Sequence, residues 1–206
     1  LRSVGSNRPF KIFVAACVFT GVGYGAWFAL LFLFVDAYLG LGEKFSAVFM
    51  TSFGLGIIAL GIWYKVAGRL GKQKTWLIGM LLVLPGLLGM WALSANSNVA
   101  TLLILITMIN CGFAAFNSMV PSLLSDIVDF GVLKSGADCT ATYFSFYTLI
   151  NKTVVALGGA IGFSIAGFFG FDPTINQHGS DAVLGLRLGV VLIPALSVLV
   201  SIVLIA

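Results

Sequence analysis

Six long apolar segments dominate this chain, and few folds can accommodate them. Of the 206 residues, 60% are hydrophobic and only 9% are charged, whereas a typical soluble domain carries about 25% charged residues. A membrane-spanning helix requires roughly 17–25 mostly apolar residues. The predicted spans cover about 11–35, 46–64, 76–93, 99–124, 142–170 and 183–206. Period-two alternation is absent, which argues against a membrane β-barrel. The sequence therefore predicts an all-α membrane protein whose residues 1–206 form one unit of six transmembrane helices.

The basic residues gather at alternate ends of the predicted spans. The N-terminal segment and every second connection between spans carry eight basic residues: Arg2, Arg8, Lys11, Lys65, Arg69, Lys72, Lys74 and Lys134. The alternate connections carry only Lys44. By the positive-inside rule, the connections that are rich in Lys and Arg lie in the cytoplasm. We therefore expect a multi-pass protein of the cell (inner) membrane with both ends of this chain cytoplasmic. The net charge of +4 is then a topology signal for a chain in a lipid bilayer, and nucleic-acid binding is not expected.

The cysteines and the single histidine suggest neither a disulfide framework nor a metal site. Cys17 and Cys111 lie inside predicted spans, Cys139 lies between two spans, and no metal-ligand spacing links them. His178 falls in a polar connection and is expected to be a surface residue. Because the chain starts without Met and ends within an apolar run at Ala206, we expect it to be a piece of a longer protein.

One polar stripe interrupts the fifth span. Lys152 lies well inside this span, and a lysine in hydrocarbon costs roughly 3 kcal/mol or more unless it is paired, snorkels or faces water. Thr148 precedes it by four residues and shares its helix face. Tyr147 and Asn151 form an adjacent pair at the same spacing. A water-filled pathway, and hence transport, explains this stripe; contact with another polar helix, or a lysine that reaches an interface, explains it too.

Other polar residues lie in and after the fourth span. Asn110 and Asn117, seven residues apart, either face the same cavity or hydrogen-bond between helices. Asp126 and Asp129 are one helical turn apart at the predicted end of the span, where carboxylates oppose the helix dipole. They require a basic partner, such as Lys134 or a group outside this chain. A conformational gate and a solvated helix end both fit these acids.

An enzyme is not expected. A paired-carboxylate hydrolase would need a nucleophile, a metal set or a pocket outside the membrane, and the sequence offers none of them near these acids. Arg187, at the start of the sixth span, is expected to snorkel toward the surface.

Glycine and proline positions predict features of helix packing. Glycines spaced by four let helix backbones approach closely. Such pairs are Gly21 with Gly25 and Gly158 with Gly162, and Gly54 and Gly61 are further candidates. Pro85 and Pro194 lie within spans and each removes a backbone donor, so each predicts a bend.

Several short motifs resemble one transporter family. The segment GRLGKQK, with Gly68, Arg69, Gly71 and Lys72, resembles the signature loop of the major facilitator superfamily, although Gly68 stands where an Asp is usual. The segments SDIVDFGVLKSG and YFSFYTLINK resemble the glycoside–pentoside–hexuronide:cation symporters, the melibiose-carrier family. NRPFKIF, GFDPT and AVLGLRL are similar to further pieces of that family. The resemblance implies that the chain is the C-terminal half of a fold of about twelve helices.

This resemblance implies cation-coupled symport of a sugar or glycoside by alternating access, together with an N-terminal six-helix half. It places Lys152 in the substrate and cation cavity, with Tyr147, Thr148, Asn151 and Asn117 as further candidates. The acids Asp126 and Asp129 with Lys134 would then belong to a cytoplasmic gate. No cofactor is expected apart from the coupling cation, Na⁺ or H⁺.

The chain departs from the family pattern at Asp138 and Thr140, where Arg and Glu are common. A lysolipid or drug carrier of the same fold, and a six-helix membrane assembly subunit without transport activity, are the alternatives.

Overall fold

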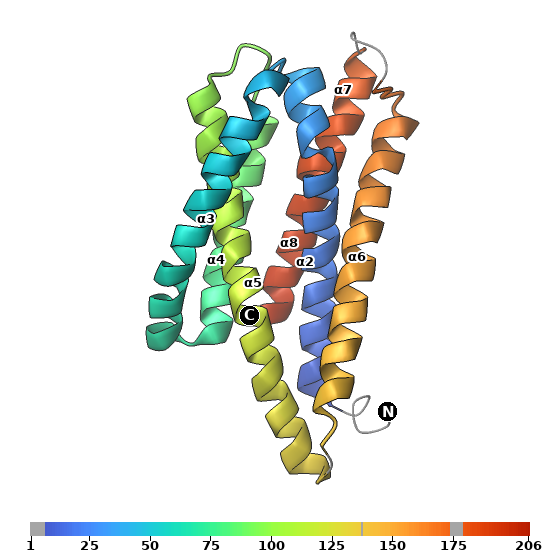
Figure 1. The fold of residues 1–206 in the computed structure, drawn as a ribbon. Coiled ribbons are helices and arrows are strands. Elements are labelled where there is room, and N and C mark those ends of the chain that lie inside the picture. Colours follow the sequence, from blue (N-terminus) through green and yellow to red (C-terminus); the bar gives the residue numbers. More distant parts are fainter. Residues whose placement is uncertain (1–6, 137, 174–178) are drawn as a thin grey trace.

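The computed structural model describes residues 7–136, 138–173 and 179–206 and is built from long helices, with no strand in these segments (Figure 1). The helical elements are α2 (Arg8–Leu33), η1 (Phe34–Tyr38), α3 (Gly42–Leu70), α4 (Lys72–Trp91), α5 (Val99–Ser135), α6 (Thr140–Phe168), α7 (Ser180–Arg187), η2 (Leu188–Leu192) and α8 (Ile193–Ile205). The π-helical segments η1 and η2 continue their neighbours, so these elements make six helices long and apolar enough to cross a membrane. The predicted all-α fold with six spans is confirmed.

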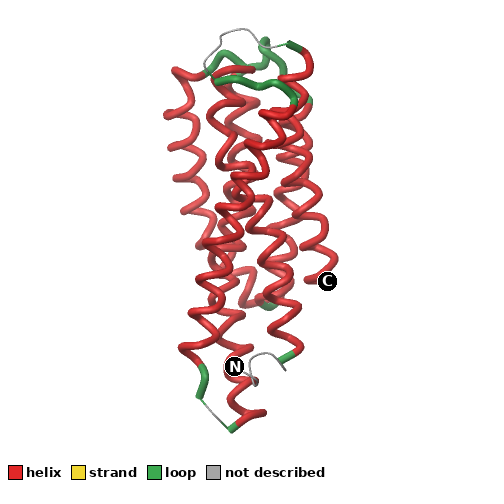
Figure 2. Tube along the Cα trace, turned by 90° about the vertical axis from the view of Figure 1, so that its right-hand side faces the viewer, coloured by secondary structure: helices red, strands yellow, loops and turns green. Residues whose placement is uncertain are grey.

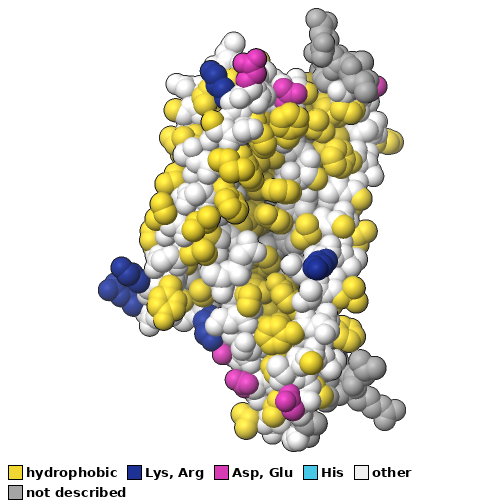
Figure 3. All heavy atoms as spheres, in the orientation of Figure 1, with side chains coloured by type: hydrophobic (Ala, Val, Ile, Leu, Met, Phe, Trp, Pro, Cys, Tyr) yellow, Lys and Arg dark blue, Asp and Glu magenta, His cyan; other side chains and the backbone are white. Residues whose placement is uncertain are grey.

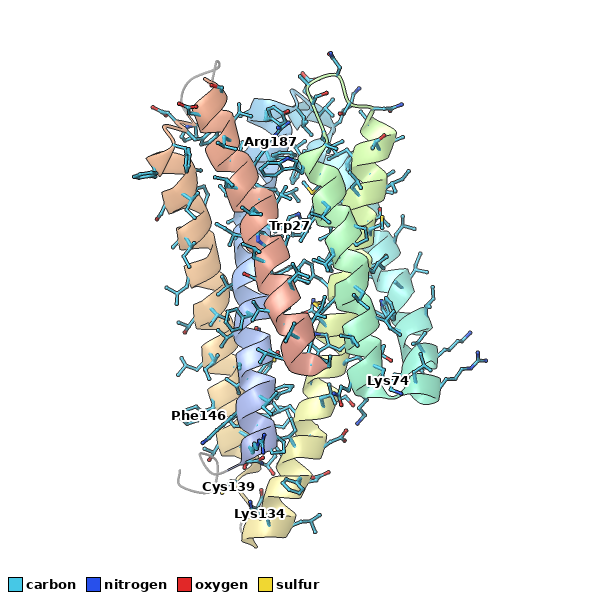
Figure 4. All side chains as sticks on the ribbon, turned by 180° about the vertical axis from the view of Figure 1, so that it is seen from behind. Trp27, Lys74, Lys134, Cys139, Phe146 and Arg187 are labelled. Atoms are coloured by element: carbon cyan, nitrogen blue, oxygen red, sulfur yellow. The ribbon has the colours of Figure 1, made fainter. Side chains whose placement is uncertain are left out.

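The helices run along one common axis, with the loops gathered at the two ends (Figure 2). In Figure 1 the upper end holds the α4–α5 connection, and the lower end holds the α3–α4 and α5–α6 connections. Helices α2, α3, α5 and α6 form the face turned to the viewer in Figure 1, and α4 and α8 cover the opposite face (Figure 4). Helix α2 packs against α6 and α8, whereas α5 packs against α3 and α4. The chain therefore forms two three-helix groups side by side.

A continuous apolar core joins these two groups. Trp27 of α2, Met80 of α4 and Phe113 of α5 are almost completely buried in it. Trp27 and Phe113 place their ring centroids 5.9 Å apart. Packing of this kind holds membrane helices together, because lipid tails supply no hydrophobic driving force between them.

Glycines bring α2 and α6 together as predicted. A Cβ atom on Gly25 would overlap the carbonyl oxygen of Val155, and one on Gly158 would overlap the carbonyl oxygen of Val22. Gly54 and Gly61 do not act in this way, because no atom lies within 4 Å of their Cβ positions. Within the described residues no helix packs against α3 at these two positions, so the close contact predicted for them is absent from this part of the protein.

Helix α5 is longer than the sequence predicted. It continues beyond residue 124 to Ser135 and ends at Gly136, whose φ of +67° suits glycine. Asp126, Asp129 and Lys134 therefore lie on a helix that projects below the other helices, as Figure 1 shows for this end of α5. The extension persists because Val128 is buried against the neighbouring helices.

The signature segment turns at a single residue. Helix α3 runs to Leu70 and α4 starts at Lys72, so Gly71, with φ of +86°, is the entire connection. Gly68 lies inside α3 and makes no turn. Pro194 lies two residues after the end of η2, so a π-helical segment precedes the proline at which a bend was predicted.

Candidate functional site

The predicted stripe on α6 divides into two halves. Thr148 and Lys152 are exposed, whereas Tyr147 and Asn151 are partly buried against α2. Lys152 is the only basic residue of α6, and a basic side chain is visible partway along the α6 side of the face in Figure 3, far from the charges at the two ends. Helix α6 forms this face together with α2, α3 and α5 (Figure 1).

The inward half of the stripe contacts α2. The ring of Tyr147 lies 5.9 Å from that of Phe13, in a tilted arrangement. The side-chain oxygen of Asn151 is buried and accepts no hydrogen bond from any described residue. Buried amide oxygens in folded proteins almost always have a partner. The side-chain oxygen of Asn151 is therefore a buried acceptor that the described part of the chain leaves unused.

A separate pocket of about 160 Å³ lies between α2, α3 and α5. Its lining residues are Tyr24, Phe53, Gly56, Ile57, Leu60, Asn110, Phe113, Ala114 and Asn117. The two asparagines predicted to share a face thus line one pocket. Asn110 also donates from Nδ2 to the hydroxyl oxygen of Ser52 on α3, at 2.8 Å. Lys152 is not among the lining residues, so the chain by itself does not bring Lys152 and Asn117 into one pocket.

At the lower end, the signature segment is joined to the α5 extension. Lys72 Nζ lies 2.7 and 2.8 Å from the two carboxylate oxygens of Asp126, and it also donates to the Ser122 carbonyl at 3.3 Å. The two side chains are 36% and 55% exposed, so the pair contributes at most about 1 kcal/mol. Within the described residues Asp126 therefore pairs with Lys72, and not with Lys134 as the sequence suggested. Asp129 and Lys134 are exposed and form no ion pair with any residue that the structure describes.

A second junction at this end was not predicted from the sequence. Asn7 donates from Nδ2 to the Tyr143 hydroxyl at 3.1 Å and to the Ile127 carbonyl at 3.4 Å, and its Oδ1 caps α2 through the Phe10 N–H. A Cβ atom on Gly131 would lie 2.7 Å from the Tyr143 hydroxyl oxygen. The segments NRPFKIF, SDIVDFGVLKSG and YFSFYTLINK thus meet at one buried point. The only available signal was their joint resemblance to one family.

The upper end is held by Arg187. Its Nη2 donates to the Tyr38 hydroxyl and, at 2.9 Å, to the Leu93 carbonyl, and its guanidinium lies 4.7 Å from the Tyr38 ring centroid. Figure 4 shows Arg187 among the helices at this end. These contacts go beyond the expected snorkelling toward the surface, because they join α7 to η1 and to Leu93 in the connection after α4.

The α5–α6 connection carries one perturbed carboxylate. Asp138 Oδ1 accepts hydrogen bonds from the Thr140 hydroxyl at 2.6 Å and from the Thr140 N–H at 2.9 Å. These bonds hold the pKa of Asp138 below its ordinary value. The two residues that depart from the family pattern therefore interact with each other at the start of α6. His178, the other connection residue considered above, lies outside the described residues.

Comparisons with known proteins identify the family. The profile of the family described as "MFS/sugar transport protein" matches residues 1–206. The chain belongs to this family. It is 27% identical over 192 residues to an uncharacterized symporter, YjmB, of Bacillus subtilis strain 168. The aligned region covers 93% of this chain and 41% of that protein. Over 119 residues it is 32% identical to the isoprimeverose transporter of Lactiplantibacillus pentosus, covering 54% of this chain and 24% of the relative.

A third relative is the glucuronide carrier protein homolog of Escherichia coli K12, 25% identical over 196 residues, covering 94% of this chain and 42% of that protein. The chain thus spans less than half the length of each of these relatives. The six spans of this MFS sugar-transport chain agree with a multi-pass membrane protein.

Proposed function

We propose that this chain is the C-terminal half of a cation-coupled sugar or glycoside symporter that works by alternating access with an N-terminal six-helix half. The observation that carries the proposal is Lys152, which is exposed within the span of α6, one of the four helices that form the face of α2, α3, α5 and α6. A lysine there requires water, a counter-charge or both. A second six-helix half covering this face would supply them, with the substrate between the halves near the membrane midplane.

The substrate class follows from the family and from the polar groups on this face. The names of two relatives refer to isoprimeverose and to a glucuronide. The amide groups of Asn117 and Asn151 and the hydroxyls of Thr148 and Tyr147 are suited to bind the hydroxyl groups of such compounds. A lysolipid or drug carrier would need a more uniformly apolar face here.

The coupling cation would bind mainly to the other half. Every Asp and Glu of this chain lies near the end of a helix or in a connection, and the described residues contain no group of three or more His, Cys, Asp or Glu that could hold a metal ion. Na⁺ and H⁺ coupling both require an oxygen ligand or a carboxylate. A cation that stabilises the sugar-binding state is in turn bound more tightly when the sugar is present.

The coupling is tested with the complete carrier in liposomes that contain a dye for H⁺ or for Na⁺. Adding isoprimeverose or p-nitrophenyl glucuronide outside should carry one of these cations inward together with the sugar. Sugar entry without movement of either cation would contradict symport. Entry of a labelled lysophospholipid, without entry of any sugar, would favour the alternative carrier.

The lower end of the bundle is proposed to face the cytoplasm, on the charge asymmetry of its loops. Cys139 lies at this end, near Lys134 (Figure 4). With Cys17 and Cys111 replaced by alanine, a membrane-impermeant maleimide should label Cys139 in inside-out vesicles and leave it unlabelled in intact cells. Labelling of intact cells would reverse the proposed orientation.

A further inference from the structure

The pocket between α2, α3 and α5 has no charged lining residue. Its walls consist of aliphatic side chains, the rings of Tyr24, Phe53 and Phe113, and the amides of Asn110 and Asn117. Apolar walls with a few placed polar groups are typical of small-molecule sites. An ionised group inside would lose hydration without gaining a counter-charge from the wall. The lining therefore suits an uncharged part of a ligand.

The orientation of the Asn110 amide in this pocket is fixed by Ser52. Ser52 is completely buried, and its hydroxyl donates to the Phe49 carbonyl at 2.8 Å. With that proton committed, the Ser52 oxygen can only accept, so Asn110 must present its NH₂ group to Ser52. The Asn110 oxygen is then left as an acceptor that no described hydrogen bond uses. It is not one of the buried atoms without a partner, so it remains accessible from the pocket. A hydroxyl donor in the pocket can reach it.

The aromatic rings form a corner beside this acceptor. The rings of Tyr24 and Phe113 meet edge to face, with centroids 4.9 Å apart and an angle of 75° between their planes. Phe113 is 2% exposed and its ring centroid lies 5.9 Å from that of Trp27, so Phe113 supports Tyr24 and leaves the Tyr24 ring to contact a ligand. A pyranose ring offers C–H groups on its faces and hydroxyl groups at its edge, which match an aromatic corner beside an amide. The volume of about 160 Å³ is below the roughly 300–1,000 Å³ of a complete small-molecule site, so the pocket holds one part of the substrate.

We propose that Asn110 determines substrate specificity: its side-chain oxygen accepts a hydrogen bond from a hydroxyl of an uncharged pyranose ring that rests on Tyr24. Ser52 acts as a positioning residue, because it orients the amide and does not touch the ligand. This inference rests on the proposed function, since the ring is enclosed only when the second half covers the pocket. An acidic group of a substrate would lie outside this pocket.

The test uses the complete carrier, purified in detergent, and measures the binding of p-nitrophenyl glucoside, galactoside and xyloside. The neutral glycoside that binds most tightly is then compared with its mono-deoxy analogues, each of which lacks one hydroxyl. Asn110→Leu should weaken binding of the parent glycoside by about tenfold, the value of one hydrogen bond. One deoxy analogue should bind wild type and Asn110→Leu equally, because it lacks the hydroxyl that Asn110 recognises.

Two further variants separate recognition from structure. Asn110→Gln keeps an uncharged amide with an acceptor oxygen and should retain more of the parent affinity than Asn110→Leu. Ser52→Ala should weaken binding of the parent glycoside less than Asn110→Leu does. The loss should again disappear for the deoxy analogue that lacks the hydroxyl recognised by Asn110. A damaged fold would instead weaken the binding of the parent glycoside and of every deoxy analogue alike. That result would overturn the role of Asn110.

The outcomes also distinguish this inference from the proposed function. If wild type binds none of the neutral glycosides but still accumulates p-nitrophenyl glucuronide in response to a cation gradient, the inference fails and the symporter stands. If wild type moves no sugar under any gradient, both fail.

Discussion

Lys152→Ala is expected to lower cation-driven sugar uptake by the complete carrier by roughly tenfold or more, because losing one member of a desolvated charge pair costs about 2 kcal/mol or more. The lysine is exposed in this chain on the face proposed to meet the second half, so its effect should appear only in the assembled carrier. Removing an intramembrane charge eases insertion, and the amount of protein in the membrane should therefore not fall. Uptake is measured with labelled sugar in vesicles, normalised to carrier content.

Lys65→Ala is the matched control, because Lys65 is an exposed lysine near the lower end of α3. It should leave uptake near the wild-type rate. Wild-type uptake with unchanged cation dependence in Lys152→Ala would exclude Lys152 from the mechanism.

Gly25→Ala is expected to destabilise the folded chain, because its new methyl group would overlap the backbone carbonyl of Val155 on α6. A backbone atom cannot rotate away as a side chain can, so α2 and α6 must separate. Overpacking of this kind costs about 1–3 kcal/mol, and Gly158→Ala should behave alike because it meets the Val22 carbonyl. The thermal unfolding temperature of the purified carrier should fall by several degrees in both variants.

Gly54→Ala and Gly61→Ala provide the comparison, since both residues are in α3 with open space around them. Replacing glycine by alanine inside a helix normally stabilises it by about 0.5–1 kcal/mol. These variants should therefore keep or slightly raise the unfolding temperature. An unfolding temperature for Gly25→Ala at or above wild type would show that α2 and α6 are not in backbone contact.

The spans were predictable from sequence because membrane length and apolarity are local properties. The glycine pairs show where local reasoning stops: Gly21 with Gly25 and Gly158 with Gly162 pack as predicted, but Gly54 and Gly61 do not. Glycine spacing gives the face of a helix that a partner could approach, and only the arrangement of the helices decides whether a partner is there.

The polar residues show the same limit more strongly. Asp126 was recognised as needing a cation, yet its partner Lys72 lies 54 positions away in the sequence and was assigned only to the signature loop. The predicted fourth span ended at about residue 124, whereas α5 continues to Ser135 with Val128 buried on it. The Asn110 and Asn117 pocket could be anticipated from their seven-residue spacing, but the contribution of Tyr24 from α2 could not.

The central claim, that this chain is half of a sugar symporter, is tested most directly by separating the halves. The chain alone, and the chain co-expressed with an N-terminal six-helix half, are reconstituted in liposomes, and accumulation of labelled sugar is measured under an imposed Na⁺ or H⁺ gradient. Accumulation is expected only when both halves are present, because the polar groups of α6 need a facing half to enclose a substrate and no carboxylate lies deep in a span of this chain. Gradient-driven accumulation by the chain alone would contradict the claim and would indicate that two copies of this chain form the transporter.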